Sequence, residues 1–276
     1  MRSRVMRSRL MCAAAMGTAV LMVVTLGVIR TSGQTRASSI PRGTDGRPKL
    51  DGIWQAMNTA NWDLQDHSQV GGPTQLGALS STPGGLGVVD GNEIPYRPEA
   101  LAKKKANFAK RWSEDPEVKC YLPGVPRATY MPYPFQIVQS ANKILIMYAY
   151  AGAVRAINLD KIPESTVDTW MGHSVARWEK DTLVVDVNAF TGQAWLDRAG
   201  NHHSDELKVT ERYTMIGPDH INYEATLEDP KTFTRPWKIS MPLYRNIDRR
   251  AHLVNYKCVE FSEEVLYGHL RKKPKP

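Results

Sequence analysis

The chain has 276 residues and a formal net charge of +8 at pH 7. Residues 1–37 contain six arginines and no acidic residue, so the rest of the chain carries +8 less 6, which is +2. A basic face that binds nucleic acid is therefore not expected. The length is sufficient for one large β domain with a hydrophobic core.

An export signal is predicted over residues 1–37. An arginine-rich start precedes residues 10–29, which are apolar or small throughout, as in the charged and hydrophobic regions of a signal peptide. Thr35 and Ala37 suit a cleavage site, which predicts a periplasmic or secreted protein beginning at Ser38. The alternative is an uncleaved anchor, because about 20 apolar residues can span a bilayer. Contact with a membrane is expected only in that case.

Two cysteines remain after the signal, Cys120 and Cys258. An exported protein matures where thiols oxidise, so we predict a disulfide between them. The alternative is a pair of buried free thiols.

Residues 38–134 are expected to form a strand, a loop and a helix that pack on the core. Gly52-Ile53-Trp54 begins the strand, and the same short pattern occurs in lipocalin-like barrels, where the tryptophan plugs one end. Residues 67–98 are rich in Gly and Pro, which predicts a long loop acting as a lid or as a surface strap. Pro98 suits the first turn of a helix over residues 98–113. Residues 120–134 are predicted to be irregular because of their prolines.

From residue 135 the apolar period changes to two, which is typical of strands separated by short turns. The expected strands cover 135–139, 143–150, 153–159, 173–178, 182–188, 206–216, 221–228, 233–241 and 253–259. The fold class predicted is mainly β: an antiparallel meander over residues 135–270, closed as a lipocalin-like barrel or stacked as a two-sheet sandwich. Residues 271–276 are expected to form a basic tail.

Several motifs are specific enough to compare with a known family. They are Asp115-Pro116-Glu117 followed by Cys120, Pro123-Gly124-Val125-Pro126-Arg127, and Arg177-Trp178-Glu179-x-Asp181-Thr182-Leu183-Val184-Val185-Asp186. With them the chain resembles a family of exported proteins of unknown function from soil bacteria. The resemblance implies export and a β-rich fold, and it implies no activity or catalytic residue.

Two charged residues fall on apolar faces of predicted strands. Glu211 alternates with Leu207, Val209, Tyr213 and Met215. Arg235 likewise alternates with Phe233, Trp237, Ile239 and Met241. A buried carboxylate needs a partner or water, so we expect Glu211 and Arg235 to pair.

That pair allows two interpretations. It is either a brace between strands or the polar part of a ligand cavity, with Glu211 as acid/base and Arg235 as an anion or oxyanion anchor. Further polar and aromatic side chains are assigned to the ligand site in the second interpretation. They are Trp178, Tyr213, Trp237, Asp205 and His173.

His202, His203 and Asp205 form a second polar group. His203 is a candidate acid or base because the pKa of histidine lies near neutrality. A metal site here is an alternative, although adjacent histidines diverge in an extended chain.

We therefore expect an exported protein that binds a small organic ligand, either a sugar or an aromatic compound, without a cofactor or metal. If it is an enzyme, we expect acid/base chemistry, as in a lyase, an isomerase or a hydrolase. The alternatives are an envelope protein of structural role and a metal-dependent enzyme centred on His202, His203 and Asp205.

Overall fold

The structure is a computed structural model that describes residues 39–71, 81–160 and 165–261, together with residues 265 and 269. The predicted export signal and basic tail lie outside these residues. Residues from Ile40 onward belong to one compact unit. Within the described ranges, no helix combines the length and the apolar character needed to cross a bilayer.

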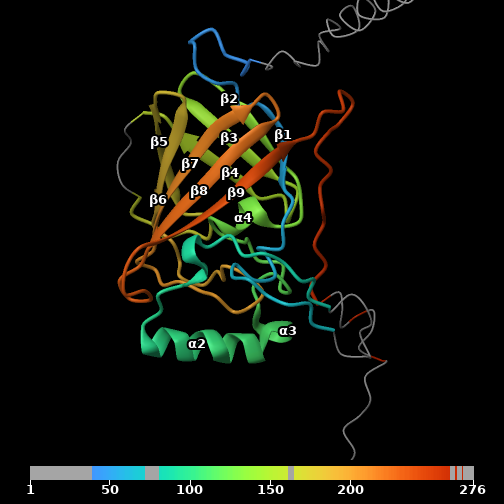
Figure 1. Cartoon of the computed structure of the whole chain (residues 1–276), viewed down its shortest axis with the longest axis vertical. Coiled ribbons are helices and arrows are strands. Elements are labelled where there is room, and N and C mark those ends of the chain that lie inside the picture. Colours follow the sequence, from blue (N-terminus) through green and yellow to red (C-terminus); the bar gives the residue numbers. More distant parts are fainter. Residues whose placement is uncertain (1–38, 72–80, 161–164, 262–264, 266–268, 270–276) are drawn as a thin grey trace, which may run out of the picture. The chain divides into compact units, whose positions relative to one another are not determined.

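Nine strands close into a barrel in the order of the chain (Figure 1). The strands are β1 (Gly52–Ala56), β2 (Phe135–Gln139), β3 (Lys143–Tyr148), β4 (Val154–Asn158), β5 (His173–Glu179), β6 (Thr182–Asn188), β7 (Lys208–Gly217), β8 (His220–Glu228) and β9 (Trp237–Arg245). Closure occurs because β1 pairs with both β2 and β9. The structure thus confirms a mainly β fold and selects the barrel over the sandwich.

The barrel departs from a purely antiparallel meander at one contact. β4 and β5 run parallel and join through two residue pairs, Ile157–Ser174 and Asn158–Val175. The other neighbouring strands are antiparallel, and β7 and β8 pair along most of their length. The β4–β5 contact is therefore the shortest seam in the wall.

Alternation of buried and more exposed residues sets the inner face of each strand. On β7 the buried residues are Val209, Glu211, Tyr213 and Met215, which is the predicted parity. Trp54 is fully buried, its indole N–H donates to the Leu50 carbonyl, and the guanidinium of Arg245 lies 4.3 Å from its ring centre.

One predicted strand begins later than expected, and another is absent: the strand predicted over 233–241 is confirmed only from Trp237. Residues 229–233 form a turn in which the backbone carbonyl of Asp229 accepts from the amides of Thr232 and Phe233, and residues 234–236 belong to no strand. β9 begins only at Trp237, after Pro236. Residues 253–259 form no strand, and Tyr256 makes only an isolated bridge with Tyr150.

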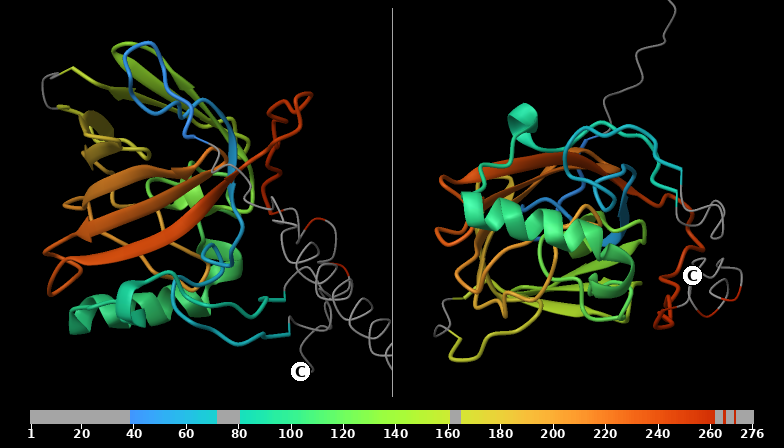
Figure 2. Two further views of the ribbon diagram at one scale, coloured as in Figure 1. Left: turned by 45° about the horizontal axis from the view of Figure 1, so that its top comes forward. Right: turned by 90° about the horizontal axis from the view of Figure 1, so that it is seen from below.

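The helices lie mainly beneath the barrel (Figure 2, right). The predicted helix over 98–113 divides into α2 (Pro98–Ala109) and α3 (Arg111–Glu114), with Lys110 between them. Its large apolar side chains are partly exposed, since Leu101 is 39% and Phe108 47% exposed. α2 instead rests on Gly200, where an added side chain would meet the helix backbone at 2.7 Å.

A further short helix, α4 (Arg127–Tyr130), lies in the segment predicted to be irregular, and all four of its residues are buried.

The described part of the Gly/Pro-rich segment behaves as a strap. It contains the short 3₁₀ helix η2 (Asp90–Asn92). Just before η2, Val89 forms an antiparallel bridge with Ile239, and the Val88 carbonyl accepts from the Ser240 amide. The strap thus supplies partners to β9 beyond the end of β1. Residues 72–80 of the predicted loop lie outside the described residues.

The predicted disulfide between Cys120 and Cys258 is present, with a sequence separation of 138 residues. Beside it, the Tyr256 amide donates to the Ala149 carbonyl, and the Phe261 amide donates to the Val118 carbonyl. The C-terminal segment after β9 is therefore fastened to the barrel by a covalent bond and a few hydrogen bonds.

Replacing both cysteines with serine should lower the free energy of unfolding by about 4 kcal/mol or less, because the unfolded chain regains a long open loop. Urea unfolding measures the change, and reduced wild-type protein is the control that should match the variant. An unchanged unfolding midpoint in both samples would show that the crosslink adds no stability.

Candidate functional site

The most unusual feature of the barrel interior is the buried carboxylate of Glu211. The residue is 0% exposed. It lies between Val185 of β6 and Ala225 of β8, both of which are also buried. An unpaired charge in such surroundings would cost several kcal/mol, so its partners decide whether the barrel is stable.

Glu211 receives hydrogen bonds on both carboxylate oxygens. The hydroxyls of Tyr213 and Tyr223 donate to Oε1 at 3.0 and 2.8 Å. Nη2 of Arg155, on β4, donates to Oε2 and completes a buried ion pair. Because β5 and β6 separate β4 from β7 in the wall, this ion pair connects strands that are not neighbours.

Arg155 is anchored on a second side as well. Its Nε donates to Ser174 Oγ on β5 at 2.8 Å. Burial by itself would lower the pKa of Arg155, but the carboxylate of Glu211 raises it well above its usual value. Burial, followed by the charge of Glu211, also raises the pKa values of Tyr213 and Tyr223 well above 10. The guanidinium stays charged and both phenols stay protonated.

Three buried polar atoms close to this pair lie near one another but form no hydrogen bond of normal length and angle. They are Nη1 of Arg155, the hydroxyl of Tyr148 on β3 and Oγ1 of Thr129 on α4. The three side chains are 2%, 4% and 0% exposed. Burial raises the pKa of Tyr148, and the nearby Arg155 and Thr129 partly offset that rise, so the three groups converge on the Tyr148 hydroxyl.

We use the name interior polar cluster for these side chains together. Its members are Thr129, Tyr148, Arg155, Ser174, Glu211, Tyr213 and Tyr223. They come from α4 and from five strands of the wall, so only the closed barrel brings them together.

The prediction that Arg235 pairs with Glu211 is wrong. Arg235 is exposed and precedes β9, and its Nη1 reaches only the carbonyl of Pro236, at 3.5 Å. The turn after Asp229 buries Phe233 without a strand, so the alternation that placed Arg235 on the inner face does not apply there.

The three residues predicted to form a second polar group do not act together. His203 is buried, its Nδ1 donates to the Ser204 carbonyl at 2.7 Å, and burial lowers its pKa. His202 stacks on Tyr96, and burial lowers its pKa to about 4. Asp205 is exposed and pairs with Lys231 at 3.0 Å.

The described residues contain no group of three histidine, cysteine or acidic side chains arranged to hold a metal ion. His203 has no hydrogen bond to Glu211, so the structure does not bring together a histidine–glutamate acid/base pair.

The other predicted ligand-site residues are distributed over both faces of the wall. Tyr213 and Trp237 point inward and are buried. Trp178 is half-buried and lies on the same side of β5 as the buried residues. The guanidinium of Arg47 lies 5.8 Å from its ring centre. His173 lies on the outward-facing side of β5 and pairs with Asn188 of β6.

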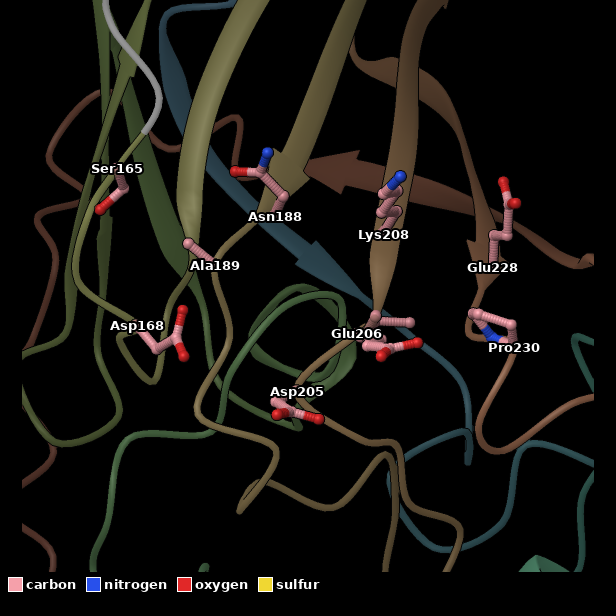
Figure 3. A pocket seen from close by; sticks show the side chains of 10 residues that line it. Ser165, Asp168, Asn188, Ala189, Asp205, Glu206, Lys208, Glu228 and Pro230 are labelled. Carbon is pink, nitrogen blue, oxygen red and sulfur yellow. The ribbon is translucent and has the colours of Figure 1, made fainter.

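A separate pocket of about 400 Å³ lies at the ends of β6, β7 and β8 (Figure 3). Its lining includes Asp205, Lys208 and Glu228, together with Asp168 from the loop before β5. Asp205 and Glu206 already share Lys231 as a partner. The pocket is thus polar and contains Asp205, but it is not part of the barrel interior.

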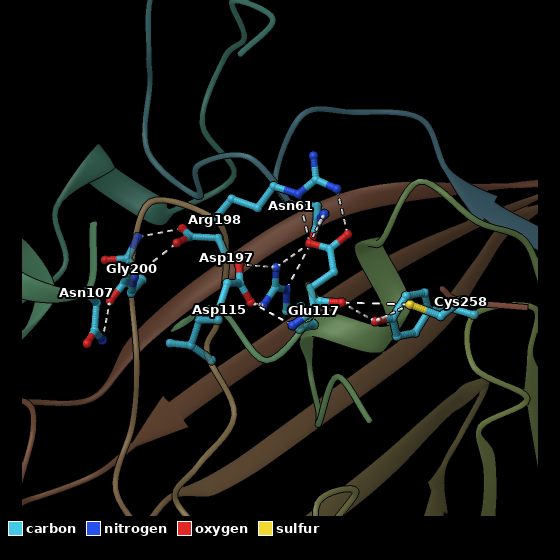
Figure 4. Close-up of polar contacts among 12 residues, drawn as sticks. Asn61, Asn107, Asp115, Glu117, Asp197, Arg198, Gly200 and Cys258 are labelled. Atoms are coloured by element: carbon cyan, nitrogen blue, oxygen red, sulfur yellow. Dashed lines mark hydrogen bonds and ion pairs between the residues drawn. The ribbon is translucent and has the colours of Figure 1, made fainter. Parts of the chain in front are cut away.

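A second buried charge system joins α4 to the disulfide region (Figure 4). Arg127 binds Asp115 through two hydrogen bonds of 2.9 and 3.1 Å and Glu117 through one of 2.7 Å. Arg198 binds the same Glu117 at 2.6 and 2.8 Å. Burial raises the pKa of Glu117, but Arg198 and then Arg127 outweigh it and lower that pKa to about 2.

We use the name lower network for the ion pairs among Asp115, Glu117, Arg127 and Arg198, and its role is structural. The backbone carbonyl of Glu117 accepts from the hydroxyl of Tyr150 at 2.9 Å, next to Cys258. Two cations balance two anions in the network, so it holds α4 and the crosslinked segment in place without a net charge.

Arg155, Tyr148 and Thr129 were missed at the sequence level. The same parity rule that found Glu211 applies to residues 153–159, where Arg155 alternates with Ala153 and Ile157. The opposite face of that short strand is also apolar, with Val154 and Ala156, so the alternation does not mark Arg155 as inward. Thr129 lies in a proline-rich segment whose helix was not predicted.

Compared with the models of known protein families and with curated proteins, the chain matches none.

Replacing Glu211 with glutamine should lower the free energy of unfolding by roughly 3 to 5 kcal/mol, because the charge of Arg155 stays buried without its partner. The glutamine oxygen still accepts from Tyr213 and Tyr223, so loss of those bonds does not explain the effect.

Chemical unfolding measures the change, and the double variant Arg155→Met, Glu211→Leu is the control. It should be more stable than Glu211→Gln because both charges are absent. A Glu211→Gln protein as stable as the wild type would contradict a buried ion pair.

The buried carboxyl of Asp197 should make the free energy of unfolding depend on pH. Burial, and then the charge of Asp63, raises its pKa from 3.8 to about 7. The folded state thus binds a proton that the unfolded state releases, so this contribution is complete below pH 3.8 and is lost as the pH rises toward 7.

In Asp197→Asn the free energy of unfolding should change less between these two pH values than in the wild type. Chemical unfolding at several pH values gives the difference between the two proteins. Asp205→Asn is the control: Lys231 lowers the pKa of this exposed carboxyl, so its effect falls mainly below pH 3.8, and the steep loss between pH 3.8 and 7 should persist. Parallel curves for Asp197→Asn and the wild type would contradict the raised pKa.

Proposed function

We propose that this protein binds a small organic molecule inside the barrel, at the interior polar cluster. The observation that carries the proposal is the convergence of three buried, unpartnered polar atoms: Arg155 Nη1, the Tyr148 hydroxyl and Thr129 Oγ1. Buried polar groups in folded proteins are nearly always hydrogen-bonded, and exceptions call for an explanation such as a ligand or water. A ligand oxygen at this position would satisfy them.

Binding fits the geometry better than acid/base catalysis by Glu211. Oε1 of Glu211 accepts from two phenols and Oε2 accepts from Arg155. A general base needs a free acceptor within hydrogen-bond reach of its substrate. The role we propose for Glu211 is to hold Arg155 and the two phenols in place.

The seam between β4 and β5 offers a route into the interior. These strands share only the pairs Ile157–Ser174 and Asn158–Val175, and Arg155 and Ser174 flank the seam on its two sides. Separating them breaks fewer backbone hydrogen bonds than opening another part of the wall, so local opening at this seam costs the least.

The proposal places the protein outside the cytoplasm. The arginine-rich apolar start of the chain and the Cys120–Cys258 disulfide support it, because structural disulfides persist in oxidising compartments.

The proposed function is tested by ligand screening with protein in which the tyrosine rings carry an NMR label. A library of uncharged and charged aromatic and sugar compounds is added one at a time. A ligand in the barrel should shift the ring signals of Tyr148, Tyr213 and Tyr223, whereas Tyr244, which is 38% exposed, should stay unchanged.

Shifts confined to surface signals would place binding elsewhere, for example in the pocket near Asp205. A library without any binder would leave the cluster as a brace of the barrel and overturn the proposed function.

A further inference from the structure

We infer that the ligand of the interior polar cluster is an uncharged compound with an apolar body that offers a carbonyl oxygen to Arg155 Nη1 and the Tyr148 hydroxyl. This inference rests on the proposed function and specifies its ligand class.

The charge of the interior favours an uncharged ligand. Among the described strands, Arg155 and Glu211 are the two charged residues that are fully buried, and they already neutralise each other. The adjacent α4 carries Arg127, whose charge is balanced by Asp115 and Glu117. A carboxylate ligand would add a buried negative charge without a free cation, which is costly in an apolar interior.

The unpartnered atoms favour an acceptor oxygen. A guanidinium nitrogen can only donate, so Arg155 Nη1 requires an acceptor. The phenol of Tyr148 stays protonated because burial raises its pKa, and it can donate to the same oxygen. Oγ1 of Thr129 can serve as an additional donor. A carbonyl oxygen has two lone pairs and matches two such donors.

Aromatic rings adjoin the cluster. The ring of Tyr148 lies 5.6 Å from that of Phe135, and the rings of Tyr213 and Tyr223 lie 5.0 Å apart, measured between ring centres. A sugar would bring several hydroxyls to a site with three free polar atoms, and its unpaired hydroxyls would weaken binding. An aromatic or aliphatic carbonyl compound places one polar atom at the cluster and apolar surface against the rings.

The experiment compares three probes of similar size by isothermal titration calorimetry on the full chain after signal removal. Acetophenone supplies the uncharged carbonyl, benzoate supplies a charged carboxylate, and ethylbenzene supplies no oxygen. Acetophenone should bind about tenfold more tightly than ethylbenzene, as expected for the gain of hydrogen bonds to buried donors. Benzoate should bind more weakly than both.

Tyr148→Phe is the decisive variant, since it removes a hydroxyl that has no partner in the structure. It should reduce acetophenone affinity about tenfold and leave ethylbenzene affinity unchanged. Its melting temperature should not fall, which separates loss of binding from loss of folding. Tyr244→Phe on the outer surface is the matched control and should bind all three probes like the wild type.

Tighter binding of benzoate than of acetophenone, or acetophenone binding that is insensitive to Tyr148→Phe, would overturn the inference while leaving an interior ligand site intact. Failure of all three probes, with a charged compound or a sugar from the library shifting the interior tyrosine signals, would also overturn it. Failure of the probes and of the whole library points to internal water alone and overturns the proposed function as well.

Discussion

The ion pair between Arg155 and Glu211 is the constraint on which the barrel interior depends. Each residue would be very costly in an apolar core without the other. The pair connects β4 and β7 across the interior, and two phenols and Ser174 supply further hydrogen bonds. Because a well-packed apolar core would be at least as stable as a buried ion pair, stability alone does not account for its presence, and the ligand site that we propose would give the pair a role.

The two buried charge systems differ in how completely they are satisfied. In the lower network, the guanidinium of Arg127 uses Nε, Nη1 and Nη2 toward Asn61, Asp115 and Glu117. Inside the barrel, Arg155 leaves Nη1 without a partner. The first pattern is expected of a structural anchor near the disulfide. The second is expected of a site that receives an acceptor from outside the chain.

Several features of the fold were predictable because they depend on local pattern. The strands from 135 to 188 have a clear period of two, and they appear close to the expected bounds. The inward position of Glu211 followed from its neighbours on one strand. The prediction for Arg235 was wrong because a turn that begins at Asp229 replaces the start of the strand, and the Ser204 amide stabilises that turn by donating to the Asp229 carboxylate. The strand predicted over residues 253–259 is absent because the β1–β9 contact closes the barrel and leaves no sheet edge for it to join.

By itself, the sequence determined the strand periodicity, the two cysteines able to pair and the presence of a carboxylate on an apolar face, since each depends on residues close together in the chain or on simple counting. Only the tertiary structure decided that the sheet closes into a barrel and that Arg155, Tyr148 and Thr129 are the residues that meet around Glu211. The physical reason is that these residues belong to separate elements. Alternation along one strand says which face a residue occupies, but closure of the wall determines which residue lies across the interior.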